Sequence, residues 1–219
     1  MSRDPLAGLR VVVSAGPTFE DIDPVRFIGN RSSGKTGFAI AAAAARRGAE
    51  VVLVAGPVAL ATPTGVARAD VRSAAQMHAA VLAALPADIY IGAAAVADFT
   101  PAAVAQGKIK KQPGEDGLVL ELVRTADILA DVASHALRPR LVVGFAAETG
   151  DLDANARGKL KRKRVDLLAA NRVGIVGSGF ESDDNTLHVF SSEGMQVLGP
   201  APKTELACAL LDLVAARLA

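Results

Sequence analysis

This 219-residue chain has only one cysteine, no tryptophan and almost no net charge. A single cysteine, Cys208, excludes an internal disulfide framework and a metal site built from several cysteines. Lys and Arg together number 24 and Asp and Glu 23, so the formal net charge is +1 and no overall field favours a nucleic-acid partner. Because Cys208 lies in an apolar, helix-patterned tail, we expect it to be a buried structural residue.

Long apolar runs are missing as well. No stretch approaches the length of a membrane-spanning helix, and the first residues contain no apolar core of a signal peptide. The sequence therefore predicts a cytoplasmic protein with no membrane partner. With 51% hydrophobic residues the chain can bury a substantial core, and since no repeat or linker divides it, we expect a single domain over residues 1–219.

Short apolar runs alternate with helix-patterned segments along the chain. Strands are expected at 9–14, 50–55, 88–94, 141–146 and 166–170. Helices are expected at 34–47, 73–85, 126–135, 153–165 and 203–218, and a hairpin at 187–190 and 196–198. This order predicts an α/β fold: a Rossmann-like parallel sheet with helices on both faces, plus a small β-hairpin or loop extension.

Glycine-rich and polar segments follow the predicted strands, at 16–33, 93–111, 146–150 and 171–185. The carboxyl ends of parallel strands meet at one edge of a sheet, and ligands bind there near the point where the strand order reverses. These segments therefore predict one binding site.

Residues 29–36, GNRSSGKT, fit the phosphate-binding pattern G-x-x-x-x-G-K-[ST]. A P-loop requires a buried strand that runs directly into the glycine loop and then into a helix. Here the apolar run ends at Val13, and the segment before Gly29 carries Pro17 and Pro24, so it cannot be a central strand. We interpret the match as accidental. The spacing of a dinucleotide-binding fingerprint is absent too, because no second glycine follows Gly16 as required.

Three other segments carry groups suited to a nucleotide. A strand end of small residues at 92–97 would let a base or ribose lie against the backbone, and Asp98 could hold a hydroxyl, or a triphosphate through Mg²⁺. The lysine loop, defined as residues 108–111 (KIKK), could bind phosphate and close over a ligand. Lys159 and Lys163 share one helical face. The alternatives are a turn cap for Asp98 and solvated faces for the lysines.

Together these motifs resemble one family, the phosphopantothenate–cysteine ligases. The matching motifs are GPT, IDPVRFI-x-N-x-SSGK, AAAVADF, KIKK, DILA and VGFAAET, continued by Asn171 and by residues 179–185. The resemblance covers essentially the whole chain. In bacteria such a ligase is usually the C-terminal half of a bifunctional protein of coenzyme A biosynthesis.

The resemblance implies a reaction in two steps. The carboxylate of 4′-phosphopantothenate attacks the α-phosphate of CTP, which gives an acyl-cytidylate and pyrophosphate, and the amine of L-cysteine then displaces CMP. It also implies Mg²⁺ on the triphosphate, with Asp98 as the candidate metal ligand, and a homodimer. An ATP or GTP hydrolase of the P-loop type and a non-catalytic nucleotide-binding module are the alternatives.

The resemblance further implies roles for individual residues. Asn30 would stabilise the acyl-cytidylate, Arg26 would bind phosphopantothenate, and Lys108 would serve nucleotide binding and the second step. A phosphate cradle would comprise Ser32, Ser33 and Gly34. The CTP pocket would comprise Gly92, Ala93, Ala94, Asp98, Lys108, Ala126, Asp127, Ile128, Leu129, Phe145, Lys159 and Lys163. Phe19 and Thr36 replace the Arg and Met common in the family; we expect activity to survive both changes.

Overall fold

The structure is a computed structural model that describes residues 4–111, 117–172 and 184–218. Its centre is an eight-stranded sheet in the order β12-β11-β10-β9-β6-β1-β4-β5. The strands are β1 (Arg10–Ala15), β4 (Glu50–Ala55), β5 (Val66–Asp70), β6 (Ile89–Gly92), β9 (Leu141–Glu148), β10 (Leu167–Arg172), β11 (Asp184–Phe190) and β12 (Met195–Pro202). The first six are parallel, whereas β11 and β12 form an antiparallel hairpin at one edge. The predicted Rossmann-like fold is confirmed.

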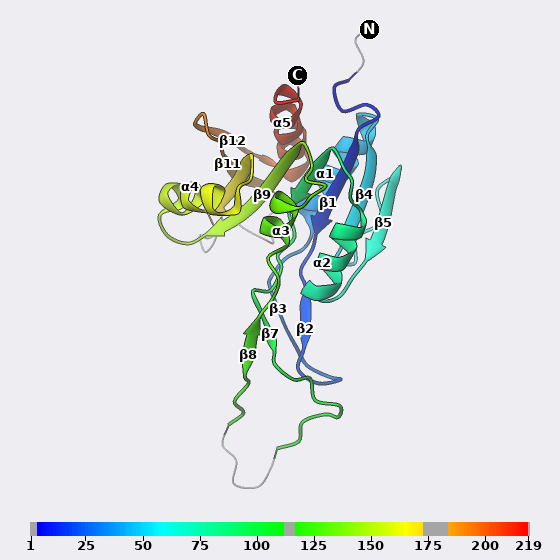
Figure 1. Cartoon of the computed structure of the whole chain (residues 1–219), viewed down its shortest axis with the longest axis vertical. Helices are drawn as coiled ribbons and strands as arrows, with labels where there is room; N and C mark the ends of the chain where they lie inside the picture. Colours follow the sequence, from blue (N-terminus) through cyan, green and yellow to red (C-terminus); the bar gives the residue numbers. More distant parts are fainter. Residues whose placement is uncertain (1–3, 112–116, 173–183, 219) are drawn as a thin grey trace.

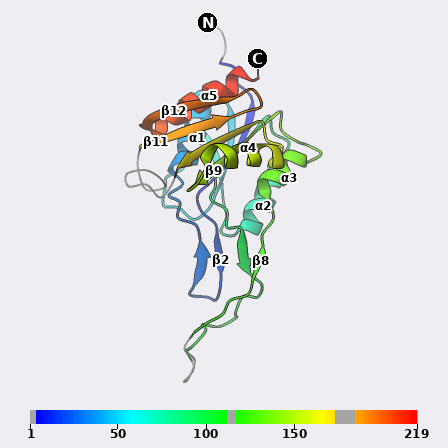
Figure 2. The ribbon, with the colours of Figure 1, turned by 90° about the vertical axis from the view of Figure 1, so that its left-hand side faces the viewer.

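Helices cover both faces of the sheet (Figures 1 and 2). On one face α1 (Lys35–Arg46) and α5 (Lys203–Ala216) pack against each other and over the sheet. On the other face lie α2 (Ala74–Ala83), α3 (Ile128–Ser134) and α4 (Leu152–Lys163). Strand β1 shows why both layers are needed: Val11 and Val13 belong to the first core and Val12 to the second, because successive side chains of a strand alternate between faces.

Local signals set the start of α2. The Ser73 side chain accepts a hydrogen bond from the Gln76 backbone N–H, and the Gln76 side chain returns one to the Ser73 backbone, which makes a capping box. The predicted helix start at Ser73 is therefore confirmed.

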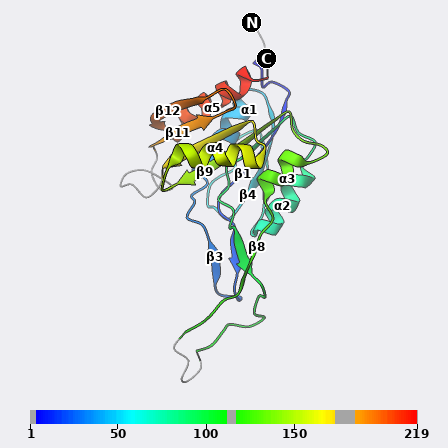
Figure 3. The ribbon, with the colours of Figure 1, turned by 60° about the vertical axis from the view of Figure 1, so that its left-hand side comes forward.

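An arm projects from the carboxyl end of the sheet (Figures 1 and 3). It contains two antiparallel pairs of three-residue strands, β2 (Phe19–Asp21) with β3 (Phe27–Gly29) and β7 (Phe99–Pro101) with β8 (Leu122–Arg124). None of these four strands was predicted, because three residues are too few to show an alternating pattern. The hairpin predicted at 187–190 and 196–198 is instead formed by β11 and β12. The edge strand β5 was missed as well: its sequence, VARAD, has no buried apolar run.

The expectation for Cys208 is wrong, because this residue is exposed. Helix α5 buries a stripe that includes Leu206, Ala207, Leu210 and Leu211, and Cys208 lies outside it. An apolar composition does not show which side of a helix faces the core. None of the described helices is long and apolar enough to cross a membrane.

Candidate active site

The reversal point of the strand order lies between β1 and β6. The chain passes from β1 to β4 and β5 on one side, and returns to β6 and then β9 on the other. Beyond these strands, the segments 16–18 and 95–97 run side by side. Ala95 N–H donates to the Gly16 carbonyl at 2.9 Å, and Ala97 N–H donates to the Thr18 hydroxyl at 2.9 Å. Two adjoining cavities open at this position, on the edge where the polar segments were predicted to meet.

The first cavity, which we call the nucleoside cavity, has a volume of about 490 Å³. Its walls come from the ends of β1, β6 and β9, the base of the arm, the start of α3, and α4. It brings together most of the residues that the resemblance assigned to CTP: Gly92, Ala94, Asp98, Ala126, Asp127, Ile128, Leu129, Phe145, Lys159 and Lys163. Phe99 and Arg124 also line it, so the base of the arm forms part of its wall.

Two buried hydroxyl groups also line the nucleoside cavity. The Ser14 and Tyr90 hydroxyls lie 3.0 Å apart, and burial raises the pKa of Tyr90 to about 12. A Cβ on Gly92 would lie 3.3 Å from the Tyr90 ring and hydroxyl, so the glycine keeps this part of the cavity open. Sequence reasoning missed the pair because both residues sit inside apolar strands, where they read as core.

The lysines of α4 differ in their surroundings. Lys159 donates from Nζ to the Phe145 carbonyl at 3.2 Å, and burial lowers its pKa, although the carboxylates of Glu148 and Asp98 act in the opposite direction. Lys163 instead forms an ion pair with Asp127, the N-cap residue of α3. An ammonium group that has lost part of its water is suited to bind a phosphate anion.

The second cavity, which we call the phosphate cavity, has a volume of about 550 Å³ and shares Asp98, Phe145 and Lys159 with the first. It is lined by Asn30, Ser32, Ser33, Gly34, Ala93, Ala94, Asn171, Asn185 and Lys203, among others. All three residues predicted for the phosphate cradle are therefore in one wall. The predicted segment 179–183, by contrast, lies outside the described residues.

Helix α1 begins at the mouth of the phosphate cavity. Gly34, at φ 74°, precedes its first turn in a left-handed conformation that favours glycine. A Cβ on Gly37 would lie 2.4 Å from the Ala15 Cβ, so only a glycine allows the helix to approach the end of β1 this closely. The first N–H groups of a helix and its dipole attract anions.

The topology excludes a P-loop at residues 29–36. Strand β3, which ends at Gly29, pairs antiparallel with β2 in the arm and is not part of the central sheet. The chain thus enters α1 from the arm. A P-loop would need a central parallel strand at this position.

Asn30 is held against the segment that follows β6. Its side-chain amide donates to the Ala95 carbonyl at 3.2 Å and to the Val96 carbonyl at 2.9 Å. Because an amide has two N–H donors, Asn30 could donate to a phosphate only by giving up one of these bonds.

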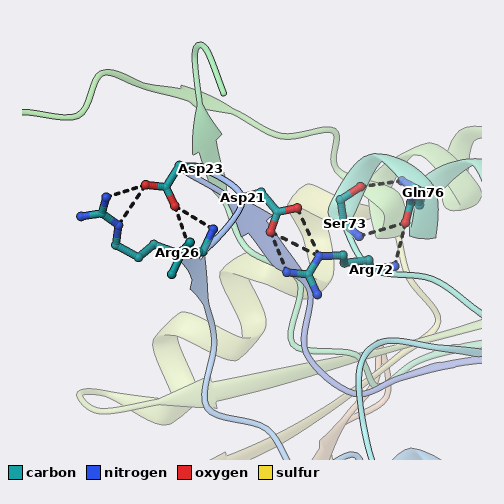
Figure 4. Close-up of polar contacts among 7 residues, drawn as sticks. Asp21, Asp23, Arg26, Arg72, Ser73 and Gln76 are labelled. Carbon is teal, nitrogen blue, oxygen red and sulfur yellow. Dashed lines mark hydrogen bonds and ion pairs between the residues drawn. The ribbon is translucent and has the colours of Figure 1, made fainter. Parts of the chain in front are cut away.

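Arg26 and Lys108 line neither cavity; both lie on the arm. Arg26 pairs with Asp23 at 2.5 Å between Nη2 and Oδ2 (Figure 4). The same Nη2 also donates to the Ile109 carbonyl at 2.7 Å. The structure therefore brings Arg26 next to the lysine loop and separates both from the residues of the nucleoside cavity.

Phe19, one of the two departures from the family pattern, stacks on Phe27 with ring centroids 4.0 Å apart. The Arg72 guanidinium lies 5.6 Å and 5.4 Å from the two ring centroids and pairs with Asp21 at 2.6 Å (Figure 4). Phe19 thus helps to join the arm to the loop before α2, where Arg72 lies. Thr36, the other departure, lines the phosphate cavity.

Two carboxylates, Asp98 and Asp127, line the nucleoside cavity, and Asp127 is paired with Lys163. Asp98 borders both cavities, and the described part of the chain contains no group of three or more His, Cys, Asp and Glu residues that could hold an ion by itself. Mg²⁺ commonly binds through one or two carboxylates together with substrate phosphates. The residues present fit a magnesium ion carried by a nucleotide.

The sequence matches the family described as the DNA/pantothenate metabolism flavoprotein C-terminal domain over residues 6–218. The coenzyme A biosynthesis bifunctional proteins CoaBC of Vibrio cholerae and Escherichia coli are each 50% identical to it, over 95% and 97% of this chain. The chain spans about half the length of these relatives, 53% in both cases.

Solved structures show the same fold. The crystal structure of the C-terminal domain of the bifunctional protein CoaBC superposes with a TM-score of 0.83 at 37% identity and covers 98% of each chain. The DNA/pantothenate metabolism flavoprotein from Streptococcus pneumoniae superposes with a TM-score of 0.81 at 22% identity, over 96% of this chain and 100% of that one.

Proposed function

Because this chain belongs to the family of the DNA/pantothenate metabolism flavoprotein C-terminal domain, we propose that it is a phosphopantothenate–cysteine ligase of coenzyme A biosynthesis. The observation that carries the proposal is the pair of adjoining cavities that share Asp98, Phe145 and Lys159. One cavity offers small residues and a helix start for a nucleoside, and the other offers a helix N-terminus for phosphates. A reaction between a nucleotide and a second anionic substrate needs both.

The proposed substrates are 4′-phosphopantothenate, L-cysteine and CTP. A carboxylate oxygen of phosphopantothenate forms a bond to the α-phosphorus of CTP, and the bond to pyrophosphate breaks. The cysteine nitrogen then bonds to the acyl carbon, the acyl–oxygen bond breaks, CMP leaves, and the amine proton passes to solvent. CTP as the nucleotide rests on the resemblance to bacterial ligases.

The chain supplies charge and N–H donors where negative charge collects in this reaction. Lys159 would contact the phosphates from the wall common to both cavities, and the start of α1 with Ser32 and Ser33 would bind them from the other side. Asp98 would hold Mg²⁺ on the triphosphate, which supplies further charge neutralisation when bound. Asn30 would bind the acyl-cytidylate at the expense of a bond to Ala95 or Val96.

A homodimer formed through the arm is part of the proposal. Large apolar side chains are exposed on the arm: Val25, Phe27, Phe99, Val104, Leu118, Val119, Leu122 and Val123. Val119 is 95% exposed, and an apolar surface of this kind marks a site of association. Since Arg26 and Lys108 lie on the same arm, we expect their contribution to catalysis to depend on the dimer.

Pyrophosphate release tests the proposal. The chain is incubated with Mg²⁺, 4′-phosphopantothenate, L-cysteine and either CTP or ATP, and each component is omitted in turn. We expect release to require phosphopantothenate and to be faster with CTP. Nucleotide hydrolysis that needs no phosphopantothenate would contradict the ligase. Binding of CTP without pyrophosphate release would show a non-catalytic binding module instead.

A further inference from the structure

The lysine loop is fastened to the β2–β3 turn through the backbone of a single residue. Ile109, which lies between Lys108 and Lys110, donates its N–H to Oδ2 of Asp23 at 3.0 Å. Its carbonyl accepts from Nη2 of Arg26 at 2.7 Å. Four residues earlier, Ala105 N–H donates to the Ile22 carbonyl at 3.0 Å. Both backbone polar groups of the residue next to Lys108 are thus bonded to the turn.

Asp23 is the centre of this arrangement. Only 1% of its surface is exposed, and its Oδ1 accepts from the backbone N–H groups of Val25 and Arg26, both at 2.8 Å. Its Oδ2 accepts from Nε and Nη2 of Arg26 and from Ile109. The Arg26 guanidinium and these N–H groups hold the pKa of Asp23 well below its usual range, so the carboxylate is charged at neutral pH.

We propose that Asp23 is a positioning residue that sets the place of Lys108 through Arg26 and Ile109. This inference rests on the proposed function, in which Lys108 serves catalysis. A backbone held at both its N–H and its carbonyl moves little, so Lys108 extends from a fixed point in an otherwise exposed loop. Arg26 acts in the same unit: its Nε and Nη2 are engaged by Asp23 and Ile109, which leaves only Nη1 for a substrate.

The substitution Asp23→Asn breaks this unit with little change in size. An amide can still accept from Val25 and Arg26 through its oxygen, but its NH₂ group then faces the Arg26 guanidinium and the Ile109 N–H, which are also donors. A matched control is Asp21→Asn. Asp21 lies two residues earlier and also pairs with an arginine, but its partner is Arg72, outside the lysine loop (Figure 4).

The first measurement needs no substrate. Deuterium exchange at the Ile109 amide should be slow in the wild-type chain and in Asp21→Asn, and at least about tenfold faster in Asp23→Asn, because exchange reports local opening. Fast exchange at Ile109 in the wild type, or equal exchange in the two variants, would show that Asp23 does not hold the lysine loop in place. This result does not depend on whether the chain is a ligase, because the measurement uses no substrate.

The second measurement is a double-substitution cycle. It follows two rates separately: pyrophosphate release in the absence of cysteine, which reports acyl-nucleotide formation, and kcat for amide formation. Asp23→Asn should lower kcat for amide formation by roughly 10- to 100-fold, the order expected when a catalytic group is displaced by about 1 Å. In a Lys108→Gln background, Asp23→Asn should lower kcat for amide formation by no more than about twofold. Asp21→Asn should lower it by no more than that in either background. If Asp23→Asn lowers kcat as much in the Lys108→Gln background as in the wild type, Asp23 does not act through Lys108.

Discussion

At the scale of single residues, the site depends on polar groups whose hydrogen bonds are already committed. Asn30 donates both amide hydrogens to the carbonyls of Ala95 and Val96, and Lys159 donates to the Phe145 carbonyl. Such bonds fix the side chains before a ligand arrives, which limits the reorganisation needed during the reaction. They also make the site sensitive to substitutions that preserve size but exchange a donor for an acceptor.

Asn30→Asp is the sharpest substitution of this kind. A carboxylate would face the carbonyls of Ala95 and Val96 and would add negative charge beside the reacting phosphate. We expect acyl-nucleotide formation to fall on the order of 100-fold. The unfolding free energy should fall by about 1–2 kcal/mol for the lost hydrogen bonds. Single-turnover pyrophosphate release and thermal unfolding measure the two effects.

Asn30→Ala is the control, since it removes the hydrogen bonds without adding charge. It should lose a similar amount of stability and clearly less activity than Asn30→Asp. Wild-type kinetics in Asn30→Asp would remove the role assigned to this residue.

At the scale of elements, the position of α1 relative to β1 decides where the helix N-terminus points. The contact depends on Gly37, which lies against Ala15 at the end of β1. Because Ala15 immediately precedes the segment that pairs with residues 95–97, a shift of the helix would change the phosphate cavity and its connection to the nucleoside cavity together.

Gly37→Ala tests this contact. The added methyl would lie 2.4 Å from the Ala15 Cβ and 3.2 Å from its Cα, so the helix or the strand must move. We expect the unfolding free energy to fall by about 1–3 kcal/mol, the usual cost of overpacking, and KM for the nucleotide to rise severalfold. Denaturant unfolding and initial rates measure these changes.

Gly158→Ala is the matched control in a helix. Gly158 lies inside α4, and a Cβ added to it would meet nothing within 4 Å. Here alanine should raise the unfolding free energy by roughly 0.5–1 kcal/mol, because it lowers the entropy of the unfolded chain. A destabilised Gly158→Ala or an unchanged Gly37→Ala would contradict the account of the α1–β1 contact.

At the scale of the whole molecule, the sheet and the arm have different tasks. The sheet, covered on both faces, holds the two cavities at its carboxyl edge. The arm extends away from it and exposes apolar side chains together with the lysine loop (Figure 1). Such a division is what we expect if the arm is completed by a second copy of the chain.

Val123→Lys tests the arm as the dimer surface. Val123 lies on β8 and is 45% exposed, and a charge there should be buried in a dimer interface at a large cost in free energy. We expect the dimer to dissociate at least about tenfold more readily and activity to fall with it. Light scattering after size-exclusion chromatography, combined with pyrophosphate release at several protein concentrations, measures both.

Val197→Lys is the matched control, since Val197 lies on the edge strand β12 and is 47% exposed. It should leave both the mass in solution and the activity within about twofold of the wild type. A Val123→Lys chain that remains a fully active dimer would show that the arm is not the interface.

The sequence by itself determined the family, the helices and every strand of the central sheet except β5. Apolar runs such as 50–55 can be buried only between two layers, and a capping residue such as Ser73 acts within its own turn, so both kinds of signal are local. The resemblance to the ligase family also indicated most of the residues that line the nucleoside cavity, and those at 92–98 follow a predicted strand directly.

Only the tertiary structure decided which distant groups meet. The arm strands are too short to show a pattern in the sequence. From the sequence, Ser14 and Tyr90 look like core residues and Asp23 looks like an ordinary turn residue. Only the structure shows the Ser14–Tyr90 pair and the bond from Ile109 to Asp23. The exposure of Cys208 likewise follows from which side of α5 faces the sheet. Each of these depends on contacts between segments far apart in the chain, and no local pattern of residue types records such contacts.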